Sequence, residues 1–181
     1  MENIRPITAD DDDKIAKIIR NNLEVYHLNI PGTAYFDPEL EHLSGYYGKE
    51  PKKREYLIVT DENGEVIGGV GIAEFKGYEN CGEIQKLYLS DKAKGKGIGK
   101  ELMKAIEETA RKKGYSRLYL ETHSTLKAAI GLYEKIGFYE IKKPQAILHT
   151  TMDRFYMKDI SQQTEMATRR ICNLSPQEMK K

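Results

Sequence analysis

The sequence has little cysteine, no long apolar run and almost no net charge, and each shortage excludes a class of protein. The two cysteines, Cys81 and Cys172, have no CxxC spacing and no histidine cluster beside them. This pattern argues against a zinc site or a disulfide scaffold, so we predict no metal ligands and a reduced, cytoplasmic setting. No apolar stretch approaches the roughly 20 residues that span a bilayer, so we expect no membrane association.

The charges nearly cancel, with 29 Lys and Arg against 28 Asp and Glu and a net charge of +1. No overall field therefore attracts nucleic acid or a membrane surface, and any anion site has to be local. The start, MENIRPITADDDD, is polar and acidic, so we expect neither a signal peptide nor a transit peptide.

Apolar periodicity predicts alternating helices and strands. Strands are expected over residues 3–8, 56–60, 65–75, 82–89, 117–122, 138–143 and 153–159, and helices over 9–28, 37–47, 98–113 and 125–136. The aspartate run is predicted to cap the first helix, and Asp37-Pro38 to begin the second. We therefore expect one mixed α/β (α+β) domain over residues 1–160, with a largely antiparallel central sheet flanked by helices. Residues 161–181 have no clear amphipathic period and are predicted to form a mobile or loosely docked tail.

Two strands carry features that bear on a site. Gly68, Gly69 and Gly71 interrupt the strand over 65–75, which indicates a bulge or a close approach by another backbone. In the strand over 82–89, simple alternation puts Glu83, Gln85 and Leu87 on one face.

The segment KAKGKGIGKELM, residues 92–103, places Gly95, Gly97 and Gly99 directly before a helical pattern. Free N–H groups in a first helical turn, flexible glycines and nearby lysines make an anion cradle, and the ligand expected is a phosphorylated cofactor. A Walker loop fails because Lys94 occupies the place of its first glycine. A dinucleotide-binding loop fails because the spacing is GxGxG and several strands precede it. A plain glycine-rich turn remains the alternative.

Two segments together resemble the GNAT N-acetyltransferase superfamily. EIQKLYLSDKAKGKGIGKELM is similar to the family's strand–loop–helix motif, and LYLETHSTLKAAIGLYEKIGFYEI to the strand and helix that follow it. The match departs from the family at Lys94, where Gln or Arg is usual, and at Leu126, where Asn is frequent. The resemblance implies the acyl-CoA N-acyltransferase (GNAT) fold and acetyl-CoA as cofactor.

The resemblance also implies roles for individual residues. Tyr133 matches the family's usual general acid, and Glu83 is the candidate base, with a water chain as its alternative. Substrate contacts are expected from Tyr35, Phe36 and His123. Cofactor contacts are expected from Leu87, Tyr88, Leu89, Lys94, Gly95, Lys96, Gly97, Ile98, Gly99, Lys100 and Ala129.

The function implied is transfer of an acetyl group from acetyl-CoA to a primary amine, by direct attack in a ternary complex. A small-molecule acceptor is favoured because the chain is compact and has no charged groove. A protein N-terminus or lysine is one alternative, and a non-catalytic domain that senses acyl-CoA is another. A homodimer remains open, because dimers are frequent in proteins of this type.

Overall fold

The structure is a computed structural model that describes residues 3–147 and 150–161. The predicted tail, from residue 162 onward, and Cys172 lie outside the described residues. None of the described helices combines the length and the apolar character needed to span a bilayer.

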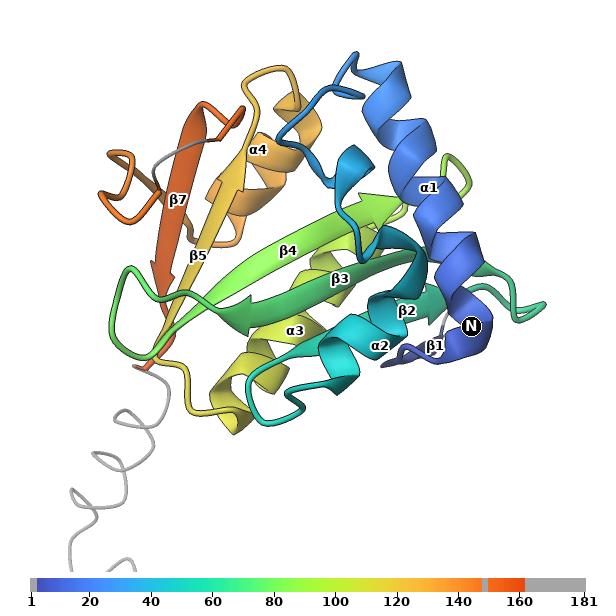
Figure 1. Cartoon of the computed structure of the whole chain (residues 1–181), viewed down its shortest axis with the longest axis horizontal. Coiled ribbons are helices and arrows are strands. Elements are labelled where there is room, and N and C mark those ends of the chain that lie inside the picture. Colours follow the sequence, from blue (N-terminus) through green and yellow to red (C-terminus); the bar gives the residue numbers. More distant parts are fainter. Residues whose placement is uncertain (1–2, 148–149, 162–181) are drawn as a thin grey trace, which may run out of the picture.

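Seven strands and four α-helices follow one another in the predicted order (Figure 1). The strands are β1 (Asn3–Pro6), β2 (Glu55–Thr60), β3 (Val66–Glu74), β4 (Cys81–Leu89), β5 (Arg117–Thr122), β6 (Tyr139–Ile141) and β7 (Arg154–Asp159). The α-helices are α1 (Asp12–Val25), α2 (Leu43–Gly48), α3 (Ile98–Lys112) and α4 (Lys127–Lys135). Short 3-10 turns η1 (Ala9–Asp11), η2 (Ala34–Phe36) and η3 (Leu40–His42) lie before α1 and between α1 and α2.

The strands form one sheet in the order β1-β2-β3-β4-β5-β7-β6. All described neighbours are antiparallel except β4 and β5, which are parallel. The mixed, largely antiparallel sheet that the sequence predicted is therefore confirmed. The single parallel pair is where the chain crosses over through α3.

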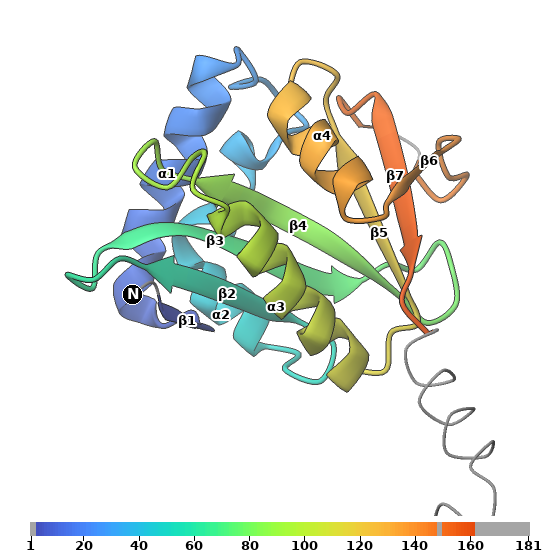
Figure 2. The same ribbon diagram turned by 180° about the vertical axis from the view of Figure 1, so that it is seen from behind.

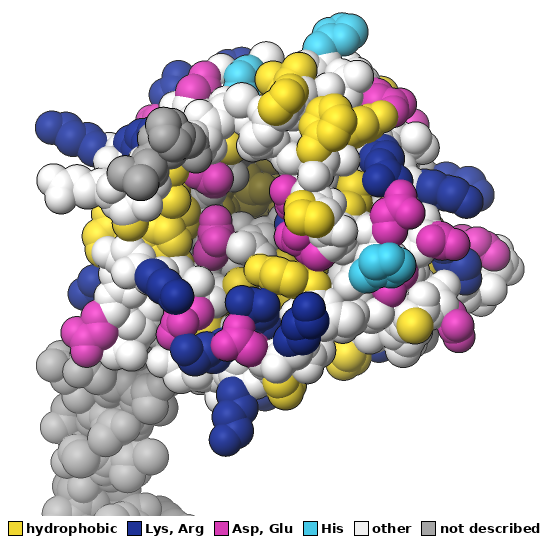
Figure 3. Space-filling model, in the orientation of Figure 1, with side chains coloured by type: hydrophobic (Ala, Val, Ile, Leu, Met, Phe, Trp, Pro, Cys, Tyr) yellow, Lys and Arg dark blue, Asp and Glu magenta, His cyan; other side chains and the backbone are white. Residues whose placement is uncertain are grey.

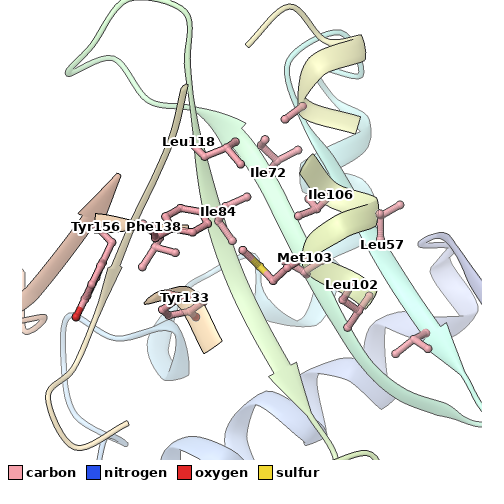
Figure 4. Close-up of a cluster of buried hydrophobic side chains, with 14 of the residues drawn as sticks. Leu57, Ile72, Ile84, Leu102, Met103, Ile106, Leu118, Tyr133, Phe138 and Tyr156 are labelled. Carbon is pink, nitrogen blue, oxygen red and sulfur yellow. The ribbon is translucent and has the colours of Figure 1, made fainter. Parts of the chain in front are cut away.

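Helices cover both faces of the sheet. Figure 1 shows α1 and α2 on the face toward the viewer, called the front face here, and Figure 2 shows α3 and α4 on the back face. The back-face core includes Leu57, Ile72, Leu102 and Met103 (Figure 4). The front-face core joins α1 and α2 to the alternate residues of β2, such as Ile58. Each strand of the centre is thus apolar on both sides, as a two-sided core requires.

Asp11 of the aspartate run takes part in the capping box of the turn η1 that leads into α1, but its side chain does not make the capping bond to α1 itself that the sequence had predicted. Asp11 accepts hydrogen bonds from the N–H and the hydroxyl of Thr8 (2.9 and 2.8 Å) and from both guanidinium nitrogens of Arg5 (2.7 and 2.8 Å). These bonds, the Arg5 bond above all, lower the pKa of the buried Asp11 to about 2. Asp12 instead accepts from the N–H and hydroxyl of Ser44, which ties α1 to α2.

The helix predicted over 37–47 is wrong in its first half. Residues 40–42 form a 3-10 turn, and α2 begins only at Leu43. His42 has φ −142° and ψ 42°, which interrupts any continuous helix. Asp37, the expected cap, instead pairs with the ammonium group of Lys86 on β4 (2.5 Å). A contact across 49 residues of sequence has therefore overridden the local capping signal.

Candidate active site

The parallel strands β4 and β5 pair over only a short segment. Cys81–Glu83 pairs with Arg117–Tyr119, whereas β4 continues to Leu89. Beyond Glu83 the two strands diverge (Figure 1). The second half of β4 therefore faces an opening instead of a neighbouring strand.

Backbone groups of β4 point into this opening. Successive residues of a strand direct their N–H and C=O groups to opposite edges. The Ser90 N–H donates to the carbonyl of Ile67 on β3 (2.8 Å), so the groups of Leu89 and Leu87 point away from β3. The Leu89 carbonyl accepts a hydrogen bond from the side chain of Asn22 on α1 (2.9 Å).

β4 contains one more residue than the part of β3 that it pairs with. Gly71 pairs with Gln85 and Gly69 with Tyr88, so two residues of β4 lie opposite one of β3. Lys86, in this interval, has a φ of +51°, which is uncommon for a residue other than glycine. The bulge that the glycines predicted is confirmed, with the extra residue on β4.

This bulge corrects the prediction that Leu87 shares a face with Glu83 and Gln85. Leu87 packs against the back-face core, whereas Tyr88 packs against the front-face core. An extra residue shifts the two-residue period of a strand by one position. Glu83 and Gln85 therefore face α1 and α2, while Leu87 and Leu89 face α3 and α4.

A largely apolar cleft of about 410 Å³ lies between the end of β4, the glycine loop and α4. Nine of the residues predicted to contact the cofactor line it: Leu87, Tyr88, Leu89, Lys94, Gly95, Gly97, Gly99, Lys100 and Ala129. The other two do not. Ile98 is buried in the back-face core, and Lys96 is exposed outside the lining.

The glycine loop has the backbone that an anion cradle needs. Gly95 and Gly97 have φ values of +76° and +84°, and a Cβ on either would meet no atom within 4 Å. Their N–H groups donate no hydrogen bond to another described residue. Lys94 lines the cleft while its ammonium group pairs with Asp91 (2.7 Å). The loop therefore offers open space, free N–H donors and nearby positive charge, which fits a pyrophosphate group.

Glycine at position 99 has a different reason. A Cβ on Gly99 would lie 3.2 Å from Leu132 and 3.5 Å from Leu89, so α3, α4 and β4 meet closely there. Leu132 and Leu126 both line the cleft, although neither was predicted to contact the cofactor. Leu126 forms an apolar wall in place of the asparagine frequent in the resembled family.

Asn22 is the polar residue that sequence reasoning missed. Its amide donates to the carbonyls of Ile18 (2.8 Å) and Leu89 (2.9 Å), so it fastens α1 to the end of β4 beside the cleft. Its position within a helical repeat gives no signal of this contact, which depends on the tertiary packing of α1.

Tyr133 lies on α4 in the back-face core, close enough to the cleft-lining Tyr88 to affect its pKa, although it is not itself among the lining residues. Its ring is 6.0 Å from that of Phe138 and 6.3 Å from that of Tyr156 (Figure 4). The hydroxyl makes no hydrogen bond with another described residue and yet is not fully enclosed. Burial raises the pKa of Tyr133, so the phenol stays protonated and able to donate.

Glu83 belongs to a chain of hydrogen bonds on the front face. The Gln85 amide donates to its Oε2 (2.7 Å), and the Tyr47 hydroxyl donates to the Gln85 carbonyl (2.9 Å). Burial raises the pKa of Glu83 on β4 and that of Glu121 on β5. The negative charge of Glu121 raises the pKa of Glu83 further.

Lys86 supplies positive charge on the same face, but its ammonium group already has two acidic partners. It pairs with Asp37 (2.5 Å) and Glu39 (3.4 Å), and only 9% of its side chain is exposed. Figure 3 shows a hollow near the middle of the front face, with acidic and hydrophobic side chains around it. Four carboxyl groups, of Glu83, Glu121, Asp37 and Glu39, outnumber the ammonium groups of Lys86 and Lys143 that act on them, so this region is acidic, which suits a cationic amine.

The predicted substrate residues lie at the edge of this region. The Tyr35 hydroxyl donates to Glu24 of α1 (2.7 Å), and its ring lies tilted against that of Phe36, which is 58% exposed. His123 follows β5, and its Nδ1 accepts from the N–H of Thr125 (3.3 Å) in the turn before α4. That bond is a local contact within the turn and does not cap α4, whose N-cap residue is Leu126. None of the three has a described contact with Glu83 or Tyr133.

The profile described as Acetyltransferase (GNAT) family matches residues 22–138. Among curated proteins, the "Uncharacterized N-acetyltransferase YjgM" of Escherichia coli is 40% identical over 141 residues, covering 76% of this chain and 82% of that protein. The L-methionine sulfoximine/L-methionine sulfone acetyltransferase of Pseudomonas aeruginosa is 32% identical over 84 residues, covering 45% of this chain and 49% of that protein.

Solved structures share the fold at lower identity. An acetyltransferase of the GNAT family from Staphylococcus aureus superposes with a TM-score of 0.77 at 18% identity, covering 88% of this chain and 99% of that one. A phosphinothricin acetyltransferase from Sinorhizobium meliloti, solved in complex with AcCoA, superposes with a TM-score of 0.69 at 23% identity, covering 88% of each chain.

Proposed function

Because the chain belongs to the acetyltransferase (GNAT) family, we propose that it transfers the acetyl group of acetyl-CoA to the primary amine of a small molecule. The proposal rests on two features that lie side by side where β4 diverges from β5. A cleft with an open glycine loop lies on one side, and a half-buried glutamate in an acidic region lies on the other.

Acetyl-CoA supplies the reactive thioester when bound. Gly95, Gly97 and the first turn of α3 hold the pyrophosphate through free N–H groups, with Lys100 adding charge. The backbone of Leu87 and Leu89 hydrogen-bonds the extended pantetheine arm as an added strand does. Because the Leu89 carbonyl already accepts from Asn22, the Leu87 groups have the greater freedom to form these bonds.

The acceptor amine has to lose a proton before it attacks. Glu83 accepts that proton from the ammonium form at Oε1, the oxygen that receives no hydrogen bond from a described residue. The raised pKa brings the carboxylate closer to the pKa of an amine and makes it a better base than an exposed glutamate. An α-amine of pKa about 8 is already roughly one tenth neutral at pH 7, so the base assists without supplying the whole rate.

Charge then develops at two places. The amine nitrogen forms a bond to the thioester carbon, and a backbone N–H of β4, that of Leu87 or Leu89, stabilises the oxyanion. When the carbon–sulfur bond breaks, Tyr133 donates a hydrogen bond to the thiolate. Since burial raises its pKa above the usual value near 10, stabilisation by this bond is easier than complete proton transfer.

A small acceptor is favoured by the location of the base. Glu83 is half-buried on the front face, beneath the segment that joins α1 to α2, where a compact amine fits more readily than a folded protein surface. The P. aeruginosa relative is named for acetylation of two small molecules, although this chain spans only about half of its length.

Two measurements test the proposal. Calorimetry on the full chain should give a heat of binding with acetyl-CoA, and a thiol-release assay over a panel of small amines should identify acceptors that release CoA. Tight acetyl-CoA binding without CoA release from any amine, peptide N-terminus or lysine would favour an acyl-CoA sensor. The absence of binding heat would remove the acetyltransfer assignment as a whole.

A further inference from the structure

The hydrogen-bond chain that ends at Glu83 has a direction fixed by chemistry. An ionised carboxylate can only accept, so the Gln85 side chain must turn its NH₂ group toward Glu83 Oε2 (2.7 Å). Its carbonyl oxygen then faces Tyr47, whose hydroxyl donates to it (2.9 Å). Burial raises the pKa of Tyr47 well above its usual value, so this donor keeps its proton at any physiological pH.

The donor at the head of the chain is held rigidly. Tyr47 is 2% exposed and its ring contacts those of Tyr46 (5.0 Å between centroids) and Tyr56 (5.2 Å). It stands directly over Gly71, the residue that pairs with Gln85 in the sheet. A Cβ on Gly71 would lie 2.6 Å from Tyr47 Cζ and closer still to its hydroxyl, so only glycine leaves room for this ring.

Three elements distant in sequence, α2, β3 and β4, thus cooperate to present one amide N–H to one oxygen of Glu83. A structural tyrosine needs only some acceptor for its hydroxyl, and Tyr56 uses a backbone carbonyl, that of Lys86 (2.8 Å). Tyr47 instead uses a side chain whose other end contacts the candidate base. The shared Gln85 amide links the packing of α2 to the orientation of the carboxylate.

We propose that Tyr47 and Gln85 are positioning residues that fix Glu83 Oε2 and leave Oε1 free to take the proton of the acceptor ammonium group. The inference rests on the proposed function, in which Glu83 is the base. The proton moves from nitrogen to Oε1 and later to solvent, and the bond between Oε2 and Gln85 persists throughout, because Oε2 accepts in both charge states.

The hydrogen bond from Gln85 also affects the pH at which Glu83 is ionised. Burial raises the pKa of Glu83, and the bond from Gln85 opposes that rise. The other titratable groups that act on or face this carboxyl are Glu121, Lys86, Asp37, Tyr47, Tyr119 and Cys81. Of the charged ones, Glu121 and Asp37 raise the pKa and Lys86 lowers it. Without the Gln85 N–H the pKa rises further, so the base is protonated at a pH where the natural enzyme is active.

The test compares kcat/KM for the acceptor at pH 6 and pH 9 in Tyr47→Phe and Gln85→Met. A hydrogen bond to a charged group has a net value that corresponds to about tenfold, so Gln85→Met should lose about tenfold at pH 6 and less than about twofold at pH 9. Tyr47→Phe should lose about threefold at pH 6, because Gln85 keeps its N–H but loses its anchor. Acetyl-CoA affinity should be unchanged in both variants.

Tyr115→Phe is the matched control. Its hydroxyl donates to the Lys53 carbonyl (2.8 Å), and its ring packs in the back-face core, on the other face of the sheet from Glu83. The variant therefore loses a tyrosine hydrogen bond without a change in the ratio of pH 6 to pH 9 activity. In a Glu83→Gln background, Tyr47→Phe should have no further effect. Equal losses at both pH values, or additive losses with Glu83→Gln, would assign Tyr47 and Gln85 a purely structural role and overturn the inference.

A second readout does not depend on turnover. The carboxyl carbon of Glu83 can be titrated by NMR in the full chain, and its midpoint should move to higher pH in Gln85→Met but stay in place in Tyr115→Phe. If the midpoint of Glu83 does not move in Gln85→Met, the positioning role of Gln85 is overturned even where acetyl transfer is established. If the midpoint moves but the protein acetylates no amine, the contact between Gln85 and Glu83 is supported and the proposed function is overturned. If Tyr47→Phe does not fold, Gln85→Met alone decides.

Discussion

Removal of one oxygen from Tyr133 should separate catalysis from stability. Tyr133→Phe deletes the hydroxyl proposed to donate to the departing thiolate and keeps the ring that packs near Phe138 and Tyr156. The hydroxyl makes no hydrogen bond with another described residue, so no partner is left unsatisfied when it is lost. The free energy of unfolding should therefore change by less than about 0.5 kcal/mol.

The kinetic effect should be much larger. A hydrogen bond to a developing anion is worth about 1.5–3 kcal/mol, and removal of a general acid costs a factor of 10² or more. We expect kcat to fall about 100-fold, which is about 2.7 kcal/mol of transition-state stabilisation. The KM for acetyl-CoA should change less than about twofold, because Tyr133 is not among the residues that line the cleft and its hydroxyl is proposed to act only on the departing sulfur. Since burial raises the pKa of the phenol, no fall in kcat between pH 8 and pH 10 should depend on its ionisation.

Tyr156→Phe is the crossed control for this experiment. The Tyr156 hydroxyl donates to Glu134 (3.2 Å), and the residue does not line the cleft. This variant should lose about 0.5–1.5 kcal/mol of stability with full activity, the reverse of the Tyr133 pattern. Thiol release at saturating acetyl-CoA and urea unfolding measure the two quantities. A kcat within threefold of the natural enzyme, or an equal loss of acetyl-CoA affinity, would refute the role assigned to the phenol.

Three further predictions concern the loop, the sheet and the start of α1. Gly97→Ala (φ +84°) should lose about 1 kcal/mol of unfolding free energy and raise the KM for acetyl-CoA several-fold. The control Gly64→Ala (φ +79°), in the β2–β3 turn, should show the same loss of stability with an unchanged KM. Equal KM values in the two variants would exclude the loop from binding. Gly71→Ala should displace Tyr47, lower the free energy of unfolding by about 1–3 kcal/mol and reproduce the pH-dependent loss of kcat/KM of Tyr47→Phe. A loss of kcat/KM that does not depend on pH would argue that the Tyr47 ring only fills space. Asp11→Asn should lower the free energy of unfolding by about 2 kcal/mol at pH 7, because the pKa of Asp11 is lowered to about 2 in the folded protein. This difference between the variant and the natural protein should disappear as the pH falls from about 4 to about 2. A pH-independent difference in urea unfolding would contradict the prediction.

Local patterns were sufficient for most of the fold. β-rich composition identified β2 and β3, and the apolar stripe of the helix identified α3, whose Leu102, Met103 and Ile106 are all buried. These features depend on neighbours a few residues away, so they can be read without tertiary information. The glycine loop belongs to the same class, because positive φ at Gly95 and Gly97 is a local backbone requirement.

Several of the errors and omissions involve long-range contacts. Asp37 was assigned to a helix start, yet its carboxylate pairs with Lys86, which lies on another element. Asn22 looked like an ordinary helical residue, and its role depends on the Leu89 carbonyl. Nothing in the segment around Tyr47 indicates that its hydroxyl reaches Gln85, which pairs with Gly71 on the neighbouring strand.

The bulge at Lys86 explains why both sides of the site can be built from one strand. In a regular strand, residues that alternate on one face stay on that face to the end, so Glu83 and Leu87 would compete for the same side. The extra residue instead keeps Glu83 and Gln85 toward the acidic front face and turns Leu87 toward the cleft. Deletion of Lys86 should remove the extra residue and place Leu87 alone opposite Val70, so Leu87, Tyr88 and Leu89 should keep their present faces. Acetyl-CoA binding should then be retained, as in Gln85→Met. A loss of binding in the deletion variant would show that the cleft needs the bend of the bulge and not only the faces of these residues.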